Sequence, residues 1–362
     1  MRLYEEYPWY AHAGSEREYL NVNRYKYSET TSPKKRAWTP EEVDYEMSFG
    51  RHPTKMCVCT MTQKCFEYWV SKYGANYESI YLNNAVAIRD LSPLADLPNL
   101  KSITVEWCRA EGLWDMSRNT KLKNLALLGA KKISANLGML KTGKSLENIL
   151  VQGDMDVPYL IPTLDVFANL PDLKRIDFLH IKVGSHDVAF LETLPSLEQF
   201  HFDPGMLTTE EIAYICAKYP DLCGCSLGAY TTGAFGCMND VRICGYRKPG
   251  LDLPEQQKRF DKYVAEFNAL VEKYKKEMAC SHLFFAFIAY GIALKRYFAA
   301  RDTLGMKTRG SALFYSAGVA VVPVAGVVEA VGFVGIIIVA ASPATTVGSL
   351  PSHFARYSRY CM

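Results

Sequence analysis

One rhythm of apolar residues constrains this chain more than any other feature of its sequence. In residues 90–107, DLSPLADLPNLKSITVEW, an apolar residue stands at every third position, and the spacing then changes to two. A spacing of three or four keeps side chains on one side of a helical turn, and a spacing of two keeps them on one face of a strand. The stretch therefore predicts a helical turn followed by a strand, with both apolar stripes directed into one interior.

The same pattern returns along the chain. It recurs in LDVFANLPDLKRIDF and VAFLETLPSLEQFHF, and in weaker form in ESIYL, LKNLAL, LENILV and LCGCSL. The inward-facing pairs begin at Ile80, Ile103, Leu125, Ile149, Ile176, Phe200 and Cys225, in steps of 23, 22, 24, 27, 24 and 25 residues. A unit of this size cannot bury its apolar stripes alone, so neighbouring units must stack and pair their strands. We therefore predict that these seven residues form adjacent rungs of one sheet.

These residues resemble a known family. The stretch LSPLADLPNLKSITVEWC, with an L-x-x-L-x-L-x-x-C motif that ends at Cys108, resembles the leucine-rich repeat, and its 22-residue form is similar to the repeats of bacterial internalins and of leucine-rich phosphatase regulators. The resemblance covers residues 66–230 and implies an α/β fold: a curved solenoid with a parallel sheet on its concave face. The closing position of the motif varies from unit to unit, which predicts irregular repeats. The 27-residue step, which contains GDMDVPYLIPT, predicts a bulged loop.

Both ends of such a stack need caps, which divides the chain into five segments. Residues 1–50 are predicted to be a partly ordered extension with one short helix, in TPEEVDYEM. Residues 51–79 form an N-terminal cap with a helix, and residues 80–230 form the repeats. Residues 231–277 are expected to be a C-terminal cap with an amphipathic helix, which packs over the last repeat or serves as a stalk or partner helix. Within the last repeat, Thr208 or Thr209 followed by two glutamates predicts a helix start.

The remaining segment, residues 278–362, is a hydrophobic, basic tail. Residues 278–294 contain no Lys, Arg, Asp or Glu, and residues 312–341 contain only Glu329. About 20 apolar residues cross the hydrocarbon core of a bilayer, so 30 exceed one straight span. Pro323 and Glu329 favour a kinked span or a tight hairpin of helices. We predict a transmembrane tail; the alternatives are an apolar subdomain buried in protein, an unfolded appendage or a reading-frame artefact.

The cellular location follows from weaker signals. The first 20 residues carry charges throughout, without the apolar run of a secretory signal, and the 11 cysteines are an odd number. Both observations favour a cytoplasmic repeat domain, anchored to a membrane through residues 278–343. The basic stretch 295–310 argues for the opposite orientation if two segments cross, because positive loops prefer the cytosol. We give more weight to the missing signal.

Catalysis is not predicted. The sequence lacks H-E-x-x-H, and its net charge of +3 does not favour nucleic-acid binding. Two groupings of cysteines look like metal ligands: Cys57, Cys59 and Cys65, and Cys223, Cys225, Cys237 and Cys244. A C-x-C pair is a weaker zinc signal than C-x-x-C, and we expect Cys225 to pack in the core. No catalytic residue, metal site or cofactor is predicted.

The function is predicted from the polar side of the strands. The predicted partner-binding residues are those beside or between the inward pairs, together with one aromatic anchor, Trp107: Tyr81, Asn83, Thr104, Glu106, Trp107, Asn148, Gln152, Arg175, Asp177, Gln199, His201 and Asp203. We predict a non-catalytic protein-binding module with a protein or peptide partner on the concave face. One alternative is a cytosolic regulatory subunit or inhibitor of an enzyme, with the tail packed in the assembly. Others are an enzyme with its site in the N-terminal extension or the tail, and polar positions that serve only solubility.

Overall fold

The protein is described here by a computed structural model, which describes residues 18–21, 39–48, 54–59, 61–154, 156–232, 239–303, 320–323 and 334–337. The chain divides into two compact units, Met1–His282 and Leu283–Met362. All repeats predicted from the sequence lie in the first unit.

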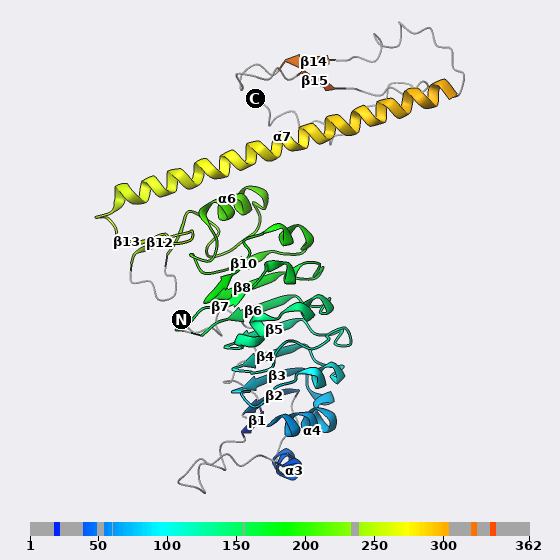
Figure 1. Ribbon diagram of the computed structural model, residues 1–362, viewed down its shortest axis with the longest axis vertical. Coiled ribbons are helices and arrows are strands. Elements are labelled where there is room, and N and C mark those ends of the chain that lie inside the picture. Colours follow the sequence, from blue (N-terminus) through cyan, green and yellow to red (C-terminus); the bar gives the residue numbers. More distant parts are fainter. Residues whose placement is uncertain are drawn as a thin grey trace. The chain divides into compact units, whose positions relative to one another are not determined.

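The first unit is built on an eight-stranded parallel sheet. Its strands follow the chain in the order β1 (Glu18–Asn21), β2 (Lys55–Cys59), β3 (Ser79–Asn83), β4 (Ser102–Glu106), β5 (Asn124–Leu128), β6 (Asn148–Gln152), β8 (Arg175–Leu179) and β10 (Gln199–His201). Figure 1 shows these strands as successive rungs. The register pairs Ile80, Ile103, Leu125, Ile149, Ile176 and Phe200 in turn, as the repeat spacing predicts.

Short 3₁₀ turns precede five of these strands: η1 (Gly74–Asn76) before β3, and η2 (Ser92–Asp96), η3 (Gly138–Thr142), η4 (Leu164–Phe167) and η5 (Ala189–Thr193) before later strands. The leucines spaced by three are their inward corners. Leu97 N donates to Leu94 O at 3.2 Å, and Leu194 N donates to Leu191 O at 3.3 Å. A 3₁₀ helix has three residues per turn, so a spacing of three places every corner on the same side. This geometry explains the triplet half of the rhythm.

The main core fills the space between the sheet and the turns. Its centre is a group of buried aromatic rings, Phe167, Phe178, Phe190, Phe200 and Phe202, whose neighbouring centroids lie 4.9 to 6.4 Å apart. One buried polar residue, Asn119, links two repeats, because its amide donates to Leu94 O and Leu97 O at 2.9 and 3.0 Å. Its side-chain oxygen accepts from Trp114 Nε1 at 2.8 Å. The backbone carbonyls of one repeat are therefore satisfied by a side chain of the next.

Helices close both ends of the repeat stack. The predicted N-terminal cap helix is α4 (Gln63–Tyr73), and α3 (Pro40–Ser48) packs beside it. At the other end, α6 (Thr209–Lys218) begins with a capping box, in which Thr208 Oγ1 accepts from Glu211 N and Glu211 Oε2 accepts from Thr208 N. Strands β1 and β2 extend the sheet ahead of β3, the first strand that the repeat pattern predicts.

The prediction that Cys225 forms the last rung of the sheet is wrong. Beyond β10 the sheet continues only as an isolated bridge between Gln199 and Cys223. Continuing this register places Gly224, rather than Cys225, beside Phe200. Cys225 is exposed, and its backbone N–H donates to His201 Nδ1 at 3.2 Å. The step of this final unit is thus 24 residues, one fewer than the spacing of apolar letters suggested.

The 27-residue step accommodates a second, smaller sheet. β7 (Tyr159–Ile161) pairs in parallel with β9 (Ile181–Val183), beyond the ends of β6 and β8. The extra residues of this unit therefore form the predicted bulge. Downstream of α6, β11 (Tyr230–Thr231), β12 (Val241–Ile243) and β13 (Gly250–Leu251) form an antiparallel sheet.

The amphipathic pattern of the C-terminal cap forms the start of a 47-residue helix, α7 (Gln257–Thr303). Phe267 is buried in the main core, and Leu270, Val271 and Tyr274 pack against it. The Tyr274 ring meets Tyr214 of α6 edge to face at 5.6 Å. This part of the helix therefore packs over the last repeat, which was one of the two predicted roles.

In the hydrophobic tail, residues 278–303 continue α7 as predicted for a helix, whereas the second apolar stretch differs from the helical prediction where it is described. Ala320–Pro323 (β14) and Val334–Ile337 (β15) form an antiparallel pair of strands. Their Val and Ile side chains are β-branched, which favours a strand over a helix. Residues 304–319, 324–333 and 338–362 lie outside the described residues, as do most of residues 1–38. No helix in the described part of the chain is both long enough and apolar enough to cross a bilayer.

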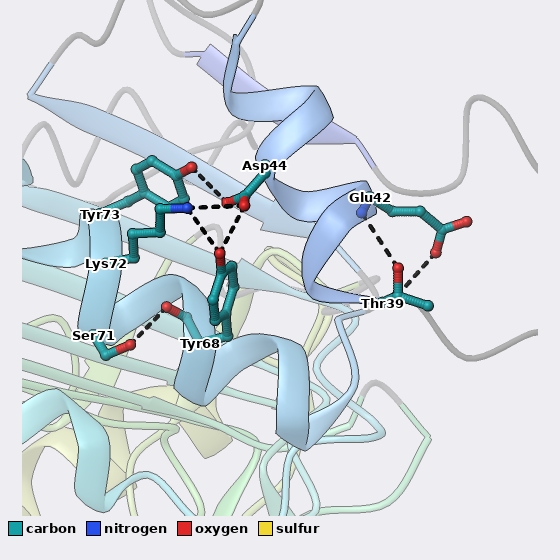
Figure 2. A network of polar contacts seen from close by, with 7 residues as sticks. All are labelled: Thr39, Glu42, Asp44, Tyr68, Ser71, Lys72 and Tyr73. Carbon is teal, nitrogen blue, oxygen red and sulfur yellow. Dashed lines mark hydrogen bonds and ion pairs between the residues drawn. The ribbon is translucent and has the colours of Figure 1, made fainter.

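A network of polar contacts joins α3 to α4 (Figure 2). Asp44 of α3 accepts hydrogen bonds from Lys72 Nζ at 2.8 Å, from the Tyr73 hydroxyl at 2.6 Å and from the Tyr68 hydroxyl at 2.7 Å. These three donors, with Lys72 first, lower the pKa of Asp44 to about 2. The same contact with Asp44 raises the pKa of Lys72. Three residues of α4 thus hold one carboxylate of α3.

We expect Asp44→Asn to loosen α3 from α4. A carboxyl group whose pKa falls on folding stabilises the folded state above its unfolded value, near 4, and this contribution is lost as the pH falls toward 2. The Lys72 contribution is complete below pH 10.5 and is lost as the pH rises through its raised pKa. Amide hydrogen exchange at pH 7 should accelerate in residues 40–48 of the variant. Ser71→Ala, which removes only a contact within α4, is the control; equal protection of α3 in both variants would contradict the role of Asp44.

Candidate functional site

The candidate site is the face of the large sheet that points away from the main core, and we call it the outer sheet face. It corresponds to the face that the sequence predicts to be concave. Its central row contains one residue from each of seven strands, each paired with the next: Cys57, Tyr81, Thr104, Ala126, Leu150, Asp177 and His201. The two flanking rows hold the first and last residues of the longer strands.

Ten of the twelve predicted partner-binding residues lie on this face. They are Tyr81, Asn83, Thr104, Glu106, Asn148, Gln152, Arg175, Asp177, Gln199 and His201. Trp107 and Asp203 follow β4 and β10. The predicted residues differ widely in solvent exposure, which the sequence pattern does not show. Tyr81, Thr104 and Asp177 are buried, whereas Trp107 is 52% exposed. The others are half-buried.

Three polar residues form a tight group on β8 and β10. Arg175 donates to both carboxylate oxygens of Asp177, with Nε to Oδ2 at 2.7 Å and Nη2 to Oδ1 at 3.0 Å. Its Nη1 donates to Gln199 Oε1 at 2.9 Å. Asp177 is fully buried, so its charge is compensated within the protein. These residues are held by one another, and Asp177 is not accessible to a partner.

A second polar pair links β3 to β4. The Tyr81 hydroxyl donates to Glu106 Oε2 at 2.5 Å. Burial raises the pKa of Glu106, and the hydrogen bond from Tyr81 partly opposes that shift. Glu106 is thus held at the carboxyl end of β4, next to Trp107.

The backbone at the ends of the strands orients Trp107. Four residues occupy equivalent turn positions, each directly after a strand. All have a positive φ angle: 51° at Asn84, 49° at Trp107, 58° at Gly129 and 54° at His180. Trp107 N donates to Leu128 O at 2.8 Å, which continues the ladder by one step. A Cβ atom on Gly129 would lie 2.3 Å from Trp107 Cδ1. Gly129 therefore supplies both the left-handed turn and the space for the indole ring.

Asp203 has a structural contact at the next such turn. Its Oδ2 accepts from His180 N at 2.5 Å. Burial raises the pKa of Asp203, and the His180 backbone N–H opposes this shift. Asp203 therefore stabilises the turn after β8.

The sequence analysis missed an apolar cluster at the centre of the outer sheet face. Ala126, Leu128 and Leu150 are buried there, and Leu179 packs against them. The signal was present in the segments NLALL and NILVQ, which contain apolar residues in succession rather than in alternation. Such runs indicate strands that are buried on both faces.

Two polar atoms beside this cluster have unused hydrogen-bonding capacity. Thr104 Oγ1 and Gln152 Oε1 are buried and have no hydrogen-bond partner in the part of the chain that the structure describes. Buried polar groups are usually paired, because an unpaired one costs about 1–3 kcal/mol. The outer sheet face thus combines apolar side chains with two buried polar atoms, a hydroxyl and an amide oxygen.

Two cysteines of the first grouping, Cys57 and Cys59, belong to β2, and Cys57 lies in the central row of this face. Cys57 and Cys65 are buried, Cys223 and Cys225 are exposed, and burial raises the pKa of Cys244 to about 12. The side chains of Cys59 and Cys237 lie outside the described residues. Among the residues that are described, His, Cys, Asp and Glu form no group of three that could hold a metal ion.

Comparisons with known proteins find likenesses among solved structures. No family model and no curated protein matches this chain. Among solved structures, it is similar to an internalin (inlF) from Listeria monocytogenes str. 4b F2365, with 20% sequence identity and a TM-score of 0.28. The match covers 49% of this chain and 53% of the internalin chain, so it spans about half of that protein. The assignment to a class rests instead on the ladder and the turns described above: the first unit is an α/β solenoid of leucine-rich-repeat-like units.

Proposed function

We propose that this protein is a non-catalytic protein-binding module. Its partner would contact the carboxyl-end rim of the outer sheet face, which consists of Asn83, Glu106, Trp107, Gln152 and Leu179. We further propose that its repeats are irregular members of the 22-residue internalin-like type. The proposal depends on one observation: an exposed tryptophan stands beside an apolar cluster that polar residues surround.

This arrangement has the composition of a protein interface. Interfaces combine an apolar centre with a polar rim, and tryptophan is enriched among the residues that contribute most to affinity. Trp107 is held by its backbone hydrogen bond and by the turn at Gly129, so little side-chain freedom would be lost on binding. Glu106 and Gln152 place a carboxyl group and a carboxamide group at the same rim, and both residues are half-buried. A partner segment with an apolar side chain and neighbouring N–H donors fits this surface.

The test is an affinity measurement on Trp107→Ala. We expect the variant to bind a partner isolated with the full chain at least tenfold more weakly, because loss of a central tryptophan typically costs more than 1 kcal/mol. Tyr246→Ala is the matched control, since Tyr246 is also 52% exposed but lies near α6, away from the rim. Partner affinity that is equal for both variants and the unchanged protein would contradict the proposed rim.

We also propose a membrane tether through residues 278–343. Its support is the charge-free run 278–294, which continues α7 and exposes Ile288 and Ile292, one helical turn apart. We propose a cytoplasmic location for the repeats, and the test is fractionation of cells that express the full chain. Retention in membranes after a carbonate wash supports the tether. Release into the soluble fraction contradicts it and favours the other candidate, a soluble regulatory subunit.

A further inference from the structure

We propose that a basic surface on the C-terminal cap binds a short segment of a second protein that is rich in Asp or Glu. This surface, which we call the cap patch, consists of Arg247 and Lys248 in the turn between β12 and β13, and of Arg259 and Tyr263 on α7. Its elements differ from those of the rim around Trp107, so the inference does not depend on the proposed function.

Aromatic rings hold the three cations of the cap patch. Lys248 Nζ and Arg259 Cζ lie over the Tyr263 ring, at 5.1 and 5.8 Å from its centre. Arg247 Cζ lies 5.0 Å from the centre of the neighbouring Tyr246 ring. The face of an aromatic ring attracts a cation, and a stacked guanidinium can still donate hydrogen bonds from its N–H edge. The rings therefore position these charges without using their donor groups.

The three cations have no acidic partners in the described part of the chain. Arg247, Lys248 and Arg259 make no ion pair there, and their described side-chain contacts are those with the tyrosine rings. Arg247 and Arg259 are exposed, and Lys248 is half-buried. In the repeats, by contrast, exposed cations such as Lys101 have an acid beside them, here Glu78 at 2.9 Å. The cap patch thus presents positive charge that can attract a negatively charged segment.

The turn that carries Arg247 is unusual for an arginine. Lys248 N donates to Gly245 O at 3.1 Å, which closes a four-residue turn, and the third residue of this turn, Arg247, has a φ of 58°. Turns with a positive φ at the third position favour glycine or asparagine, because other side chains crowd the backbone there. An arginine therefore stands where glycine would be less strained. Such strain is typical of functional positions.

The turn is also fixed to the last repeat. Gly245 N donates to Pro204 O at 2.7 Å, and Thr209 Oγ1 donates to Cys244 O at 3.2 Å. On the α7 side, Tyr263 packs against the buried core of the three-stranded sheet. A surface that is held in this way loses little conformational freedom when it binds a partner.

The charge pattern favours an acidic protein segment over a polyanion such as nucleic acid. Residues 239–266 contain six Lys or Arg and five Asp or Glu, a balance of +1, so the cap has no extended positive charge. Nucleic-acid affinity depends on many phosphate contacts, whereas one arginine can bind one carboxylate through two parallel hydrogen bonds. Tyrosine and arginine are also enriched among the residues that contribute most to the affinity of protein interfaces. A few carboxylates of one peptide therefore fit the cap patch.

Fluorescence anisotropy with the full chain and a fluorescein-labelled hexaglutamate peptide tests this binding. We expect Arg247→Gly and Arg259→Ala each to weaken the affinity for the peptide about fivefold or more, because each removes a charged donor. Glycine suits the positive φ of the turn, so Arg247→Gly removes the cation without straining the backbone. Lys258→Ala is the matched control, since Lys258 is an exposed cation next to Arg259 but stacks on no ring in the described part of the chain. Its effect should stay below about twofold.

Arg247→Lys tests the shape of the charged group, because lysine keeps the charge but lacks the planar fork. We expect a loss of about threefold in affinity for the hexaglutamate peptide. Unchanged affinity would overturn the proposed binding of carboxylates by this arginine. The proposal would also be overturned if the peptide does not bind the unchanged protein, or if Lys258→Ala weakens binding as much as Arg259→Ala, which would indicate general charge attraction.

The other possible occupants give different results, each of which would overturn the proposal. An oligothymidylate with six phosphates that binds more tightly than the peptide, and less tightly to Arg247→Gly, would indicate nucleic acid. Vesicles of phosphatidylcholine and phosphatidylserine that bind the unchanged protein more tightly than Arg247→Gly would indicate a lipid surface. Dimerisation that Arg247→Gly abolishes would indicate a second copy of the chain. Trp107→Ala should leave peptide binding unchanged, and a loss in this variant would place the peptide at the rim instead.

Discussion

Replacement of Phe178 by alanine is expected to lower the free energy of unfolding by about 3–5 kcal/mol, the cost that is typical of removing a buried phenylalanine. Phe178 is fully buried in β8. Its ring meets Phe167 at 5.1 Å and Phe200 at 5.9 Å, both edge to face. These contacts join η4, β8 and β10, which belong to two neighbouring repeats. The substitution would therefore leave a cavity where one repeat packs on the next.

Urea unfolding of the full chain, followed by circular dichroism, measures this effect. Phe178→Leu should cost less than Phe178→Ala, because it retains most of the buried volume. Leu160→Ala is a control for the loss of an apolar side chain at a site that is 53% exposed, and it should change stability by less than about 1 kcal/mol. Equal stability of Phe178→Ala and Leu160→Ala would show that the aromatic group is not the centre of the core.

Replacement of Arg175 by alanine is expected to cost a similar amount, about 3–5 kcal/mol. The substitution removes two hydrogen bonds from Asp177 and leaves its carboxylate buried without the arginine. A buried charge without a partner is far more costly than a buried pair, because the charge loses its water without compensation. The effect is thus mainly the cost of the Asp177 charge that remains.

The double variant Arg175→Met/Asp177→Leu separates the two contributions. It removes both charges and keeps the volume, so it should be clearly more stable than Arg175→Ala alone. Gln199→Ala is a control that removes only the neutral contact with Arg175. A double variant that is as unstable as Arg175→Ala would contradict the electrostatic explanation. Substitutions at Arg175 or Asp177 therefore report on folding, and Trp107 is the better probe of binding.

The repeat fold could be predicted because its signal is local and periodic. The apolar spacing within each unit is enough to predict its 3₁₀ turn and its strand. The register confirms that the inward residues from Ile80 to Phe200 are adjacent in the sheet. The capping box at Thr208 is likewise a signal between near neighbours in sequence. Such features need no information about distant parts of the chain.

Other features depend on pairing between distant segments or on what covers a surface. β2 has no triplet repeat before it, so nothing local distinguishes KMCVC from a loop. At Cys225, an apolar spacing of two suggested a strand, although the chain there forms only one bridge. In the tail, apolar composition alone could not separate a spanning helix from the strands β14 and β15.

The sequence predicted which face of the sheet the candidate site residues occupy, but it predicted their solvent exposure less well. The alternation rule placed ten residues on the correct face of the sheet, because side chains of a strand alternate strictly. It could not show that Thr104 and Asp177 are buried, since burial depends on neighbours in other strands and on covering segments. The leucines of this face were missed because an apolar residue in an outward position was not counted as a signal.

The way in which the large sheet ends at β10 affects the behaviour of the protein in crowded solution. A bare parallel edge would offer unpaired backbone groups to a second molecule and invite open-ended polymerisation. Here Phe200 N already donates to Cys223 O, and Cys223 N donates to Glu198 O. The irregular chain at that point comes directly after α6, whose Ile212 and Ile215 are buried in the same core. Strand-by-strand growth of fibrils from this end is therefore blocked within each molecule.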